Sequence, residues 1–80
     1  MSIINIEFVT DGTFNATFEV QTNSETWHSI SAINLGSMQV ESSATNKTSL
    51  YMVDLTAVSR LRVKINSTSN PISVYGKVVS

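Results

Sequence analysis

The chain contains no cysteine, and this absence removes two common ways of stabilising a small domain. Without thiols there are neither disulfides nor thiolate metal sites. One histidine and six carboxylates, scattered over 80 residues, suggest no metal cluster or cofactor site. A chain this short buries only about 60–65% of the surface that its unfolded form exposes. We therefore expect one domain, residues 1–80, with a thin core that homo-oligomerisation into a dimer or trimer would stabilise.

Charge is also scarce: 14% of the residues are charged and the formal net charge is −1. Binding of nucleic acid or of an anionic membrane requires a dense basic surface, so neither partner is expected. No hydrophobic run approaches the roughly 18 residues of a membrane span. The segment Met1 to Asn5 lacks the charged and apolar regions of a signal peptide, which predicts synthesis in a cytoplasm without secretion.

The sequence is rich in apolar and polar residues that alternate with a period of two, the pattern of half-buried β-strands. It is clearest over residues 14–20 and recurs over residues 4–8. The intervening Asp11-Gly12 is a strong hairpin signal, so we expect these two strands to pair with each other. Further strands are expected at residues 27–33, 38–41, 50–55, 60–65 and 72–79. Residues 42–49 are poor in apolar side chains and are expected to form a mobile loop.

The number and spacing of these segments predict an all-β fold. No window shows the 3.6-residue apolar period of a helix, and seven or eight short strands at spacings near ten residues suggest a sandwich or barrel. The expected architecture is a single compact antiparallel β-sandwich or jelly-roll-like barrel. The inner face of segment 27–33 is ambiguous, because Trp27 and Ile33 share one parity while Ile30 and Ala32 share the other. A bulge would reconcile them.

No group of residues predicts catalysis. His28 is the single histidine, no nucleophile motif accompanies it, and a surface or edge position is favoured. Glu7 and Glu19 face outward on strands expected to be neighbours, as a glycosidase pair would. Solvated surface carboxylates are the favoured interpretation, since so short a chain has little room for a cleft. The chain is not expected to be an enzyme.

Arg60, Arg62 and Lys64 form a basic row on one face of a predicted strand, and with Tyr75 they are the candidate interaction surface. Such a row suits an anionic partner or an intersubunit salt bridge. It is also typical of an edge strand protected against aggregation. A third interpretation is cross-strand pairing with a carboxylate. The carboxylates considered for that pairing are Glu19, Glu7 and Asp54.

The aromatic residues suggest a second kind of partner, because Trp27 and the tyrosines could stack on the sugar rings of a host-surface glycan. A lone tryptophan in a small β-domain more often anchors the core, and this is the prediction for Trp27. Tyr51 shares its parity with Val53 and is expected in the core. Tyr75 is expected to be exposed.

Two segments resemble a small β-sandwich module found in virion proteins of tailed phages. Residues 23–30 are similar to the module's polar turn followed by a tryptophan that enters the core. Residues 51–65 are similar to its aromatic-x-Val-Asp segment, with Arg62 where the module has arginine and Ala57 where it usually has glycine. The resemblance implies a non-enzymatic virion structural protein, such as a capsid decoration, head-fibre or tail component. It also implies self-association and contact with other virion proteins.

Overall fold

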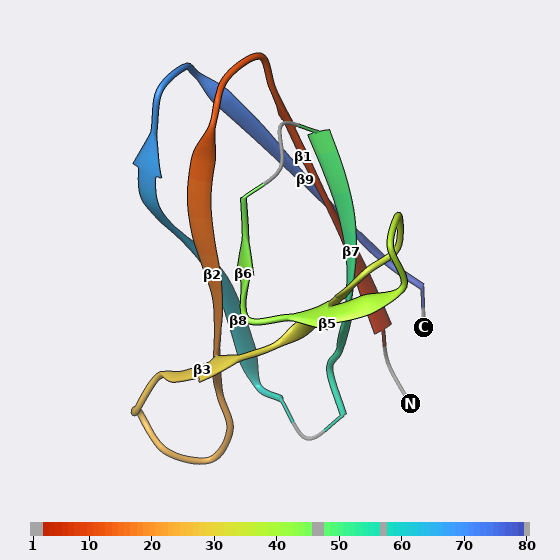
Figure 1. Ribbon diagram of the computed structural model, residues 1–80. Coiled ribbons are helices and arrows are strands. Elements are labelled where there is room, and N and C mark those ends of the chain that lie inside the picture. The colour runs from red at the N-terminus through yellow and green to blue at the C-terminus, as the bar shows by residue number, and fades with distance from the viewer. Residues whose placement is uncertain (1–2, 46–47, 57, 80) are drawn as a thin grey trace.

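The computed structural model describes residues 3–45, 48–56 and 58–79, which form two antiparallel β-sheets (Figure 1). The strands of the described residues are β1 Ile3–Thr10, β2 Phe14–Gln21, β3 His28–Ile30, β4 Ala32–Asn34, β5 Gln39–Glu41, β6 Ser43–Ala44, β7 Thr48–Asp54, β8 Arg60–Thr68 and β9 Ile72–Val78. No helix occurs among these residues. The all-β prediction is confirmed, with more strands than expected because one predicted strand divides and one predicted loop contains a strand.

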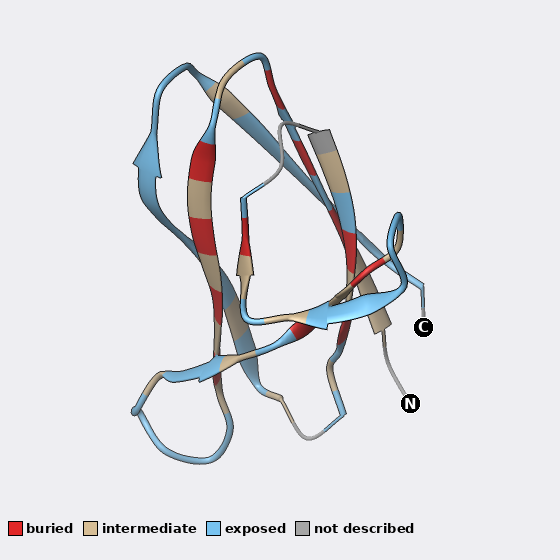
Figure 2. Ribbon diagram, viewed as in Figure 1, coloured by how far each residue is buried: buried red, intermediate tan, exposed pale blue. Residues whose placement is uncertain are grey.

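One sheet has five strands in the order β5-β4-β7-β1-β9. In the other sheet, of four strands, β2 pairs along its whole length with β8, and its opposite edge pairs with the two short strands β6 and β3. The sheets face each other, and their inner faces form the core. Figure 2 shows buried residues on β1, β2 and β7, whereas β8 and β9 are largely exposed.

The predicted hairpin between the first two strands is wrong. β1 lies between β7 and β9, and β2 lies in the other sheet, so the turn at Asp11 and Gly12 crosses between sheets. Both strands carry their large apolar side chains on one face. Stacking one face on the other buries both at once. If the strands paired side by side in one sheet, both apolar faces would need a further layer of protein to cover them. Gly12 does not adopt the positive φ that a type I′ hairpin turn requires.

Four aromatic rings from both sheets form the centre of the core. The ring centroid of Phe8 lies 5.1 Å from that of Phe14, 6.0 Å from Phe18 and 5.8 Å from Tyr51. Tilted and edge-to-face arrangements at these distances are favourable beyond the area that they bury. The prediction that Tyr51 faces the core is confirmed, since its side chain is fully buried.

The predicted strand 27–33 divides at Ser31 into β3 and β4, which belong to different sheets. The returning chain does the same, with β5 in one sheet and β6 in the other (Figure 1). A bend at which the chain changes sheets, not a bulge, therefore accounts for this segment. These two crossings close one side of the sandwich.

The prediction of a loop over residues 42–49 is wrong for the described part of that segment. Ser43 and Ala44 form β6, and Ala44 is fully buried against the core. One small side chain is enough to fill the core at this point, because β6 pairs directly with Ala16 and Thr17 of β2 and so lies close to it. One alanine is too weak an apolar signal to mark a strand in the sequence. Residues 46 and 47 lie outside the described residues.

Candidate interaction surfaces

The structure divides the predicted interaction surface between the two sheets. Arg60, Arg62 and Lys64 alternate along β8 and point outward from the four-stranded sheet, since the intervening Leu61 and Val63 pack against the core. Tyr75 lies on β9 and points outward from the five-stranded sheet, opposite Glu7 of β1. Outer faces of stacked sheets point in opposite directions. The basic row and Tyr75 therefore belong to separate surfaces.

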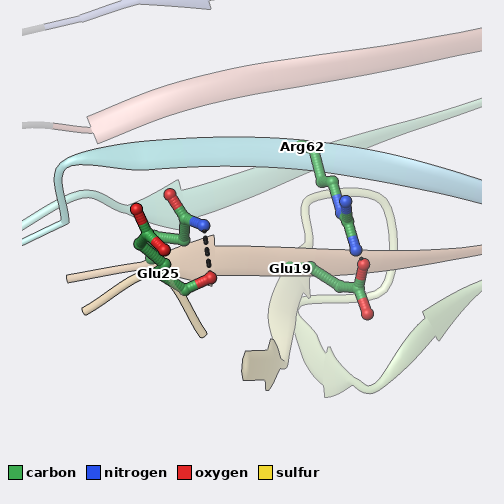
Figure 3. A network of polar contacts seen from close by, with 4 residues as sticks. Glu19, Glu25 and Arg62 are labelled. Carbon is green, nitrogen blue, oxygen red and sulfur yellow. Dashed lines mark hydrogen bonds and ion pairs between the residues drawn. The ribbon is translucent and has the colours of Figure 1, made fainter. Parts of the chain in front are cut away.

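Arg62 joins three segments on the outer face of the four-stranded sheet. Its Nε donates to Oε1 of Glu19 on β2 at 2.7 Å, and Figure 3 shows the guanidinium pointing toward that carboxylate. Its Cζ lies 4.1 Å from the ring centroid of Trp27, just before β3. The predicted cross-strand pairing is confirmed for Glu19. Within the described residues, no carboxylate forms an ion pair with Arg60 or Lys64.

The prediction that Trp27 anchors the core is wrong. Its side chain is half-buried on the outer face of the sheet, and the core cluster does not include it. The pairing of β3 with β2 gives the reason: Ser29 lies opposite the outward-facing Glu19, and Trp27 shares the parity of Ser29. Arg62 covers one face of the indole ring, which leaves less of it for stacking on a sugar.

Arg62→Ala is expected to lower the free energy of unfolding by about 1 kcal/mol, because an exposed ion pair and a cation–π contact each contribute about 0.5–1 kcal/mol. Removal of the guanidinium exposes the indole, so the fluorescence emission of Trp27 should move to longer wavelength. Urea titration and emission spectra measure both effects. Arg62→Lys is the control, since it keeps the charge and loses the planar stacking. An unchanged emission maximum in Arg62→Ala would contradict the contact.

The outer face of the five-stranded sheet is unexpectedly apolar. Ile33, Val40 and Met52 lie in one row across β4, β5 and β7. They surround a hollow of about 250 Å³, and Val40 is 70% exposed beside it. The residues that line the hollow are Ile3, Ser31, Ala32, Ile33, Val40, Met52 and Asp54. A contiguous apolar patch on a small protein is characteristic of a contact surface.

This face was missed in the sequence, although one signal was present. The run Leu50-Tyr51-Met52-Val53 is apolar at both parities, and such a strand is expected to be covered on both faces. Tyr51 and Val53 point into the core, while Leu50 and Met52 point to the outer face. The second set therefore has no layer of this chain above it in the described residues.

Neither the single histidine nor the carboxylate pair forms a candidate active site. His28 is exposed on β3, a strand at the sheet edge, as expected. Glu7 and Glu19 lie on different sheets and face opposite ways, which corrects the expectation that their strands are neighbours. Within the described residues, no three His, Asp or Glu side chains gather as metal ligands would. The part of the chain that the structure describes contains no helix long and apolar enough to cross a membrane.

A polar network lies beneath the β4–β5 hairpin. The hydroxyl of Tyr51 donates to Oε1 of Glu41 at 2.6 Å, and Nδ2 of Asn34 donates to Oε2 of the same carboxylate at 3.3 Å. Burial raises the pKa of Tyr51 well above its usual value, and the hydrogen bond to Glu41 raises it further.

At the end of β7, the pKa of Asp54 lies below its usual value because the backbone N–H of Thr56 donates to Oδ1 at 2.9 Å.

The raised pKa of Tyr51 predicts a loss of stability at alkaline pH. Above the usual tyrosine value of 10.0, the unfolded chain loses this proton while the folded chain retains it. The free energy of unfolding should therefore fall by about 1.4 kcal/mol for each further pH unit. Urea titrations between pH 9 and about 11 measure this slope. Tyr51→Phe should be less stable at neutral pH but have a flatter slope; equal slopes would contradict the prediction.

Comparisons with known proteins support the fold. No protein-family model matches the chain, and no curated protein matches it. The chain is similar in structure to the SPBc2 prophage-derived protein YomS, with a TM-score of 0.85. The match covers 95% of this chain and 68% of that chain, at 14% sequence identity. At so low an identity, the likeness establishes a shared fold.

Proposed function

We propose that this chain is a non-enzymatic structural protein of a phage-type virion, which self-associates and docks on a larger assembly as a capsid decoration, head-fibre or tail component. The observation that carries the proposal is the apolar outer face of the five-stranded sheet around Ile33, Val40 and Met52. A surface of this kind gains stability when another protein covers it. A prophage-derived protein of the same fold adds support.

The low charge and hydroxyl-rich surface are consistent with permanent assembly rather than with electrostatic capture. Only 14% of the residues are charged, so binding would depend on shape and on burial of apolar area. The basic row on β8 is less suited to be the main contact, because Glu19 already pairs with Arg62. In this proposal the chain is made in the host cytoplasm and resides in the virion, without nucleic acid or membrane as a partner.

Association with particles tests the proposal. Purified protein, mixed with virions of the parent phage from which its gene has been deleted, should sediment with the particles. Mass spectrometry should detect the chain in virions of the undeleted phage. Val40→Lys, at a 70% exposed position beside the hollow, should weaken co-sedimentation at least tenfold. Ser29→Lys, exposed on the other sheet, is the control and should bind normally. Absence from virions together with no co-sedimentation would refute the proposal.

A glycan array separates this function from adhesion to a host-surface glycan. Trp27→Ala and Tyr75→Ala are the informative variants, because both aromatic side chains lie outside the core. Specific glycan binding that either variant abolishes, combined with no binding to virions, would favour the adhesion module.

A further inference from the structure

The two long edge strands of the sandwich differ in how they are protected. Among the strands of residues 3–45, 48–56 and 58–79, β8 pairs only with β2 and β9 pairs only with β1, so within these ranges each has one free edge. β8 carries Arg60, Arg62 and Lys64, charges of the kind that prevent edge-to-edge association. β9 carries one charge, Lys77, along seven residues. The other edge strands of the described residues are only two or three residues long.

β9 also leaves apolar core surface uncovered. The registers place Val74 opposite Phe8 and Val78 opposite Ile4, so both valines have the parity of the inner face. Nevertheless, Val74 is 42% exposed and Val78 is 63% exposed. The chain crossings at β3–β4 and β5–β6 join the two sheets on the other side of the sandwich, and Figure 2 shows β9 exposed along most of its length. A strand added to β9 would cover this surface.

The backbone of β9 is oriented for such an addition. The N–H of Val79 donates to the carbonyl of Ile3 at 2.7 Å, so Ile3 and Val79 are a hydrogen-bonded pair of the antiparallel ladder. Because these pairs alternate, the polar backbone groups of Ser73, Tyr75 and Lys77 also point toward β1. The backbone N–H and C=O groups of the alternate residues point the other way, to the free edge. The edge-facing residues are Ile72, Val74, Gly76 and Val78.

We propose that the occupant of this edge is β9 of a second copy, paired antiparallel about a two-fold axis at Tyr75. This register overlaps all seven residues of both strands and places edge-facing groups opposite edge-facing groups: Ile72 opposite Val78 of the copy, and Val74 opposite Gly76. Tyr75 meets its own counterpart in a pair without hydrogen bonds, where side chains come closest. The two five-stranded sheets become one continuous sheet, with a self-complementary interface.

Charge and chemistry favour a second copy over an unrelated strand. In this register Lys77 lies opposite Ser73 of the copy, so no like charges meet. Across the strands, the apolar inner-face side chains meet each other, and the outer-face row reads Glu7, Tyr75, Tyr75, Glu7. The tyrosine pair thus separates the two carboxylates. This inference rests on the self-association in the proposed function, and it names the surface responsible.

Single-cysteine variants test the register, because the chain has no cysteine of its own. Opposed residues in a pair without hydrogen bonds have Cα atoms about 4.5 Å apart, within the range that a disulfide spans. Tyr75→Cys should therefore convert most of the protein to a covalent dimer under mild oxidation. Ser73→Cys alone should form no covalent dimer, whereas its mixture with Lys77→Cys should form the mixed covalent dimer. Ser29→Cys, on β3 in the other sheet, is the control.

Light scattering after size exclusion tests the association itself. The natural protein should approach twice 8.7 kDa as its concentration rises. Tyr75→Lys should remain a monomer with an unchanged circular dichroism spectrum, since this side chain is 58% exposed and outside the core. Ser29→Lys should still dimerise.

The outcomes separate this inference from the proposed function. A monomer at every concentration, or a dimer that Tyr75→Cys does not cross-link, would overturn the β9 interface. Cross-linking of Ser73→Cys alone would overturn the register. Dimers through β9 that never associate with virions would leave this inference intact and refute the virion role. Virion binding by a monomeric Tyr75→Lys variant would separate docking from self-association.

Discussion

Phe8→Ala is expected to remove most of the free energy that keeps the chain folded. Phe8 is fully buried, and its ring contacts those of Phe14, Phe18 and Tyr51, so truncation removes the centre of the aromatic cluster. Such a change costs about 3–5 kcal/mol. A domain of this size has a total stability at the lower end of about 5–15 kcal/mol, so little would remain.

Circular dichroism and urea titration measure this loss. Phe8→Leu, which keeps most of the volume, should cost only about 1–2 kcal/mol and remain folded. Ser67→Ala, exposed on β8, should change stability by less than about 0.5 kcal/mol. If Phe8→Ala were as stable as Ser67→Ala, the two sheets would not be joined through this cluster.

Gly12→Ala should destabilise the protein by about 1–3 kcal/mol through overpacking. A Cβ at this position would overlap Oγ of Ser69 and lie 3.0 Å from Cγ of Asn70. The hydroxyl of Ser69 cannot move freely, because it accepts from the N–H of Thr13 at 2.9 Å and donates to the Thr13 carbonyl at 3.2 Å. This contact holds the β1–β2 crossing against the β8–β9 crossing.

A double-mutant cycle with Ser69→Gly isolates the contact. The cost of Gly12→Ala, measured by urea titration, should be smaller in the Ser69→Gly background, because the obstructing hydroxyl is gone. Gly36→Ala is the matched glycine control, since its Cβ would meet only Oδ1 of Asn34 at 3.3 Å. An equal cost of Gly12→Ala in both backgrounds would show that another constraint requires glycine there.

The sequence was sufficient to predict which side chains of a strand point to the same face of its sheet. Residues 14–20 form β2 with the expected inner face, and Tyr51 and Tyr75 lie on the expected sides of their strands. Pairing could not be predicted in the same way. Asp11-Gly12 fits a tight hairpin turn and also a crossing between sheets. The crossing is fixed by hydrogen bonds to distant residues: Thr10 donates to the carbonyl of Pro71, and the N–H of Thr13 donates to the hydroxyl of Ser69.

The sequence predicted which residues of the candidate site are exposed, but not which of them lie together on one surface. The sequence indicated that Arg60, Arg62 and Lys64 share a face, and β8 confirms it. It did not indicate that Tyr75 lies on the opposite sheet, or that Arg62 reaches Trp27 across β2. Both depend on which strand lies beside which, and the alternation of a single strand contains no such information.

The sequence by itself determined that this is an all-β protein without disulfides, with little charge and with several strands that have one apolar face. These properties follow from composition and from a two-residue period, which are local. Only the tertiary structure decided that β1 and β2 stack instead of pairing, that Trp27 lies outside the core, and that β9 is an edge with few charges. The physical reason is that burial of apolar faces selects among many possible strand pairings, and that selection is made by contacts between residues far apart in the chain.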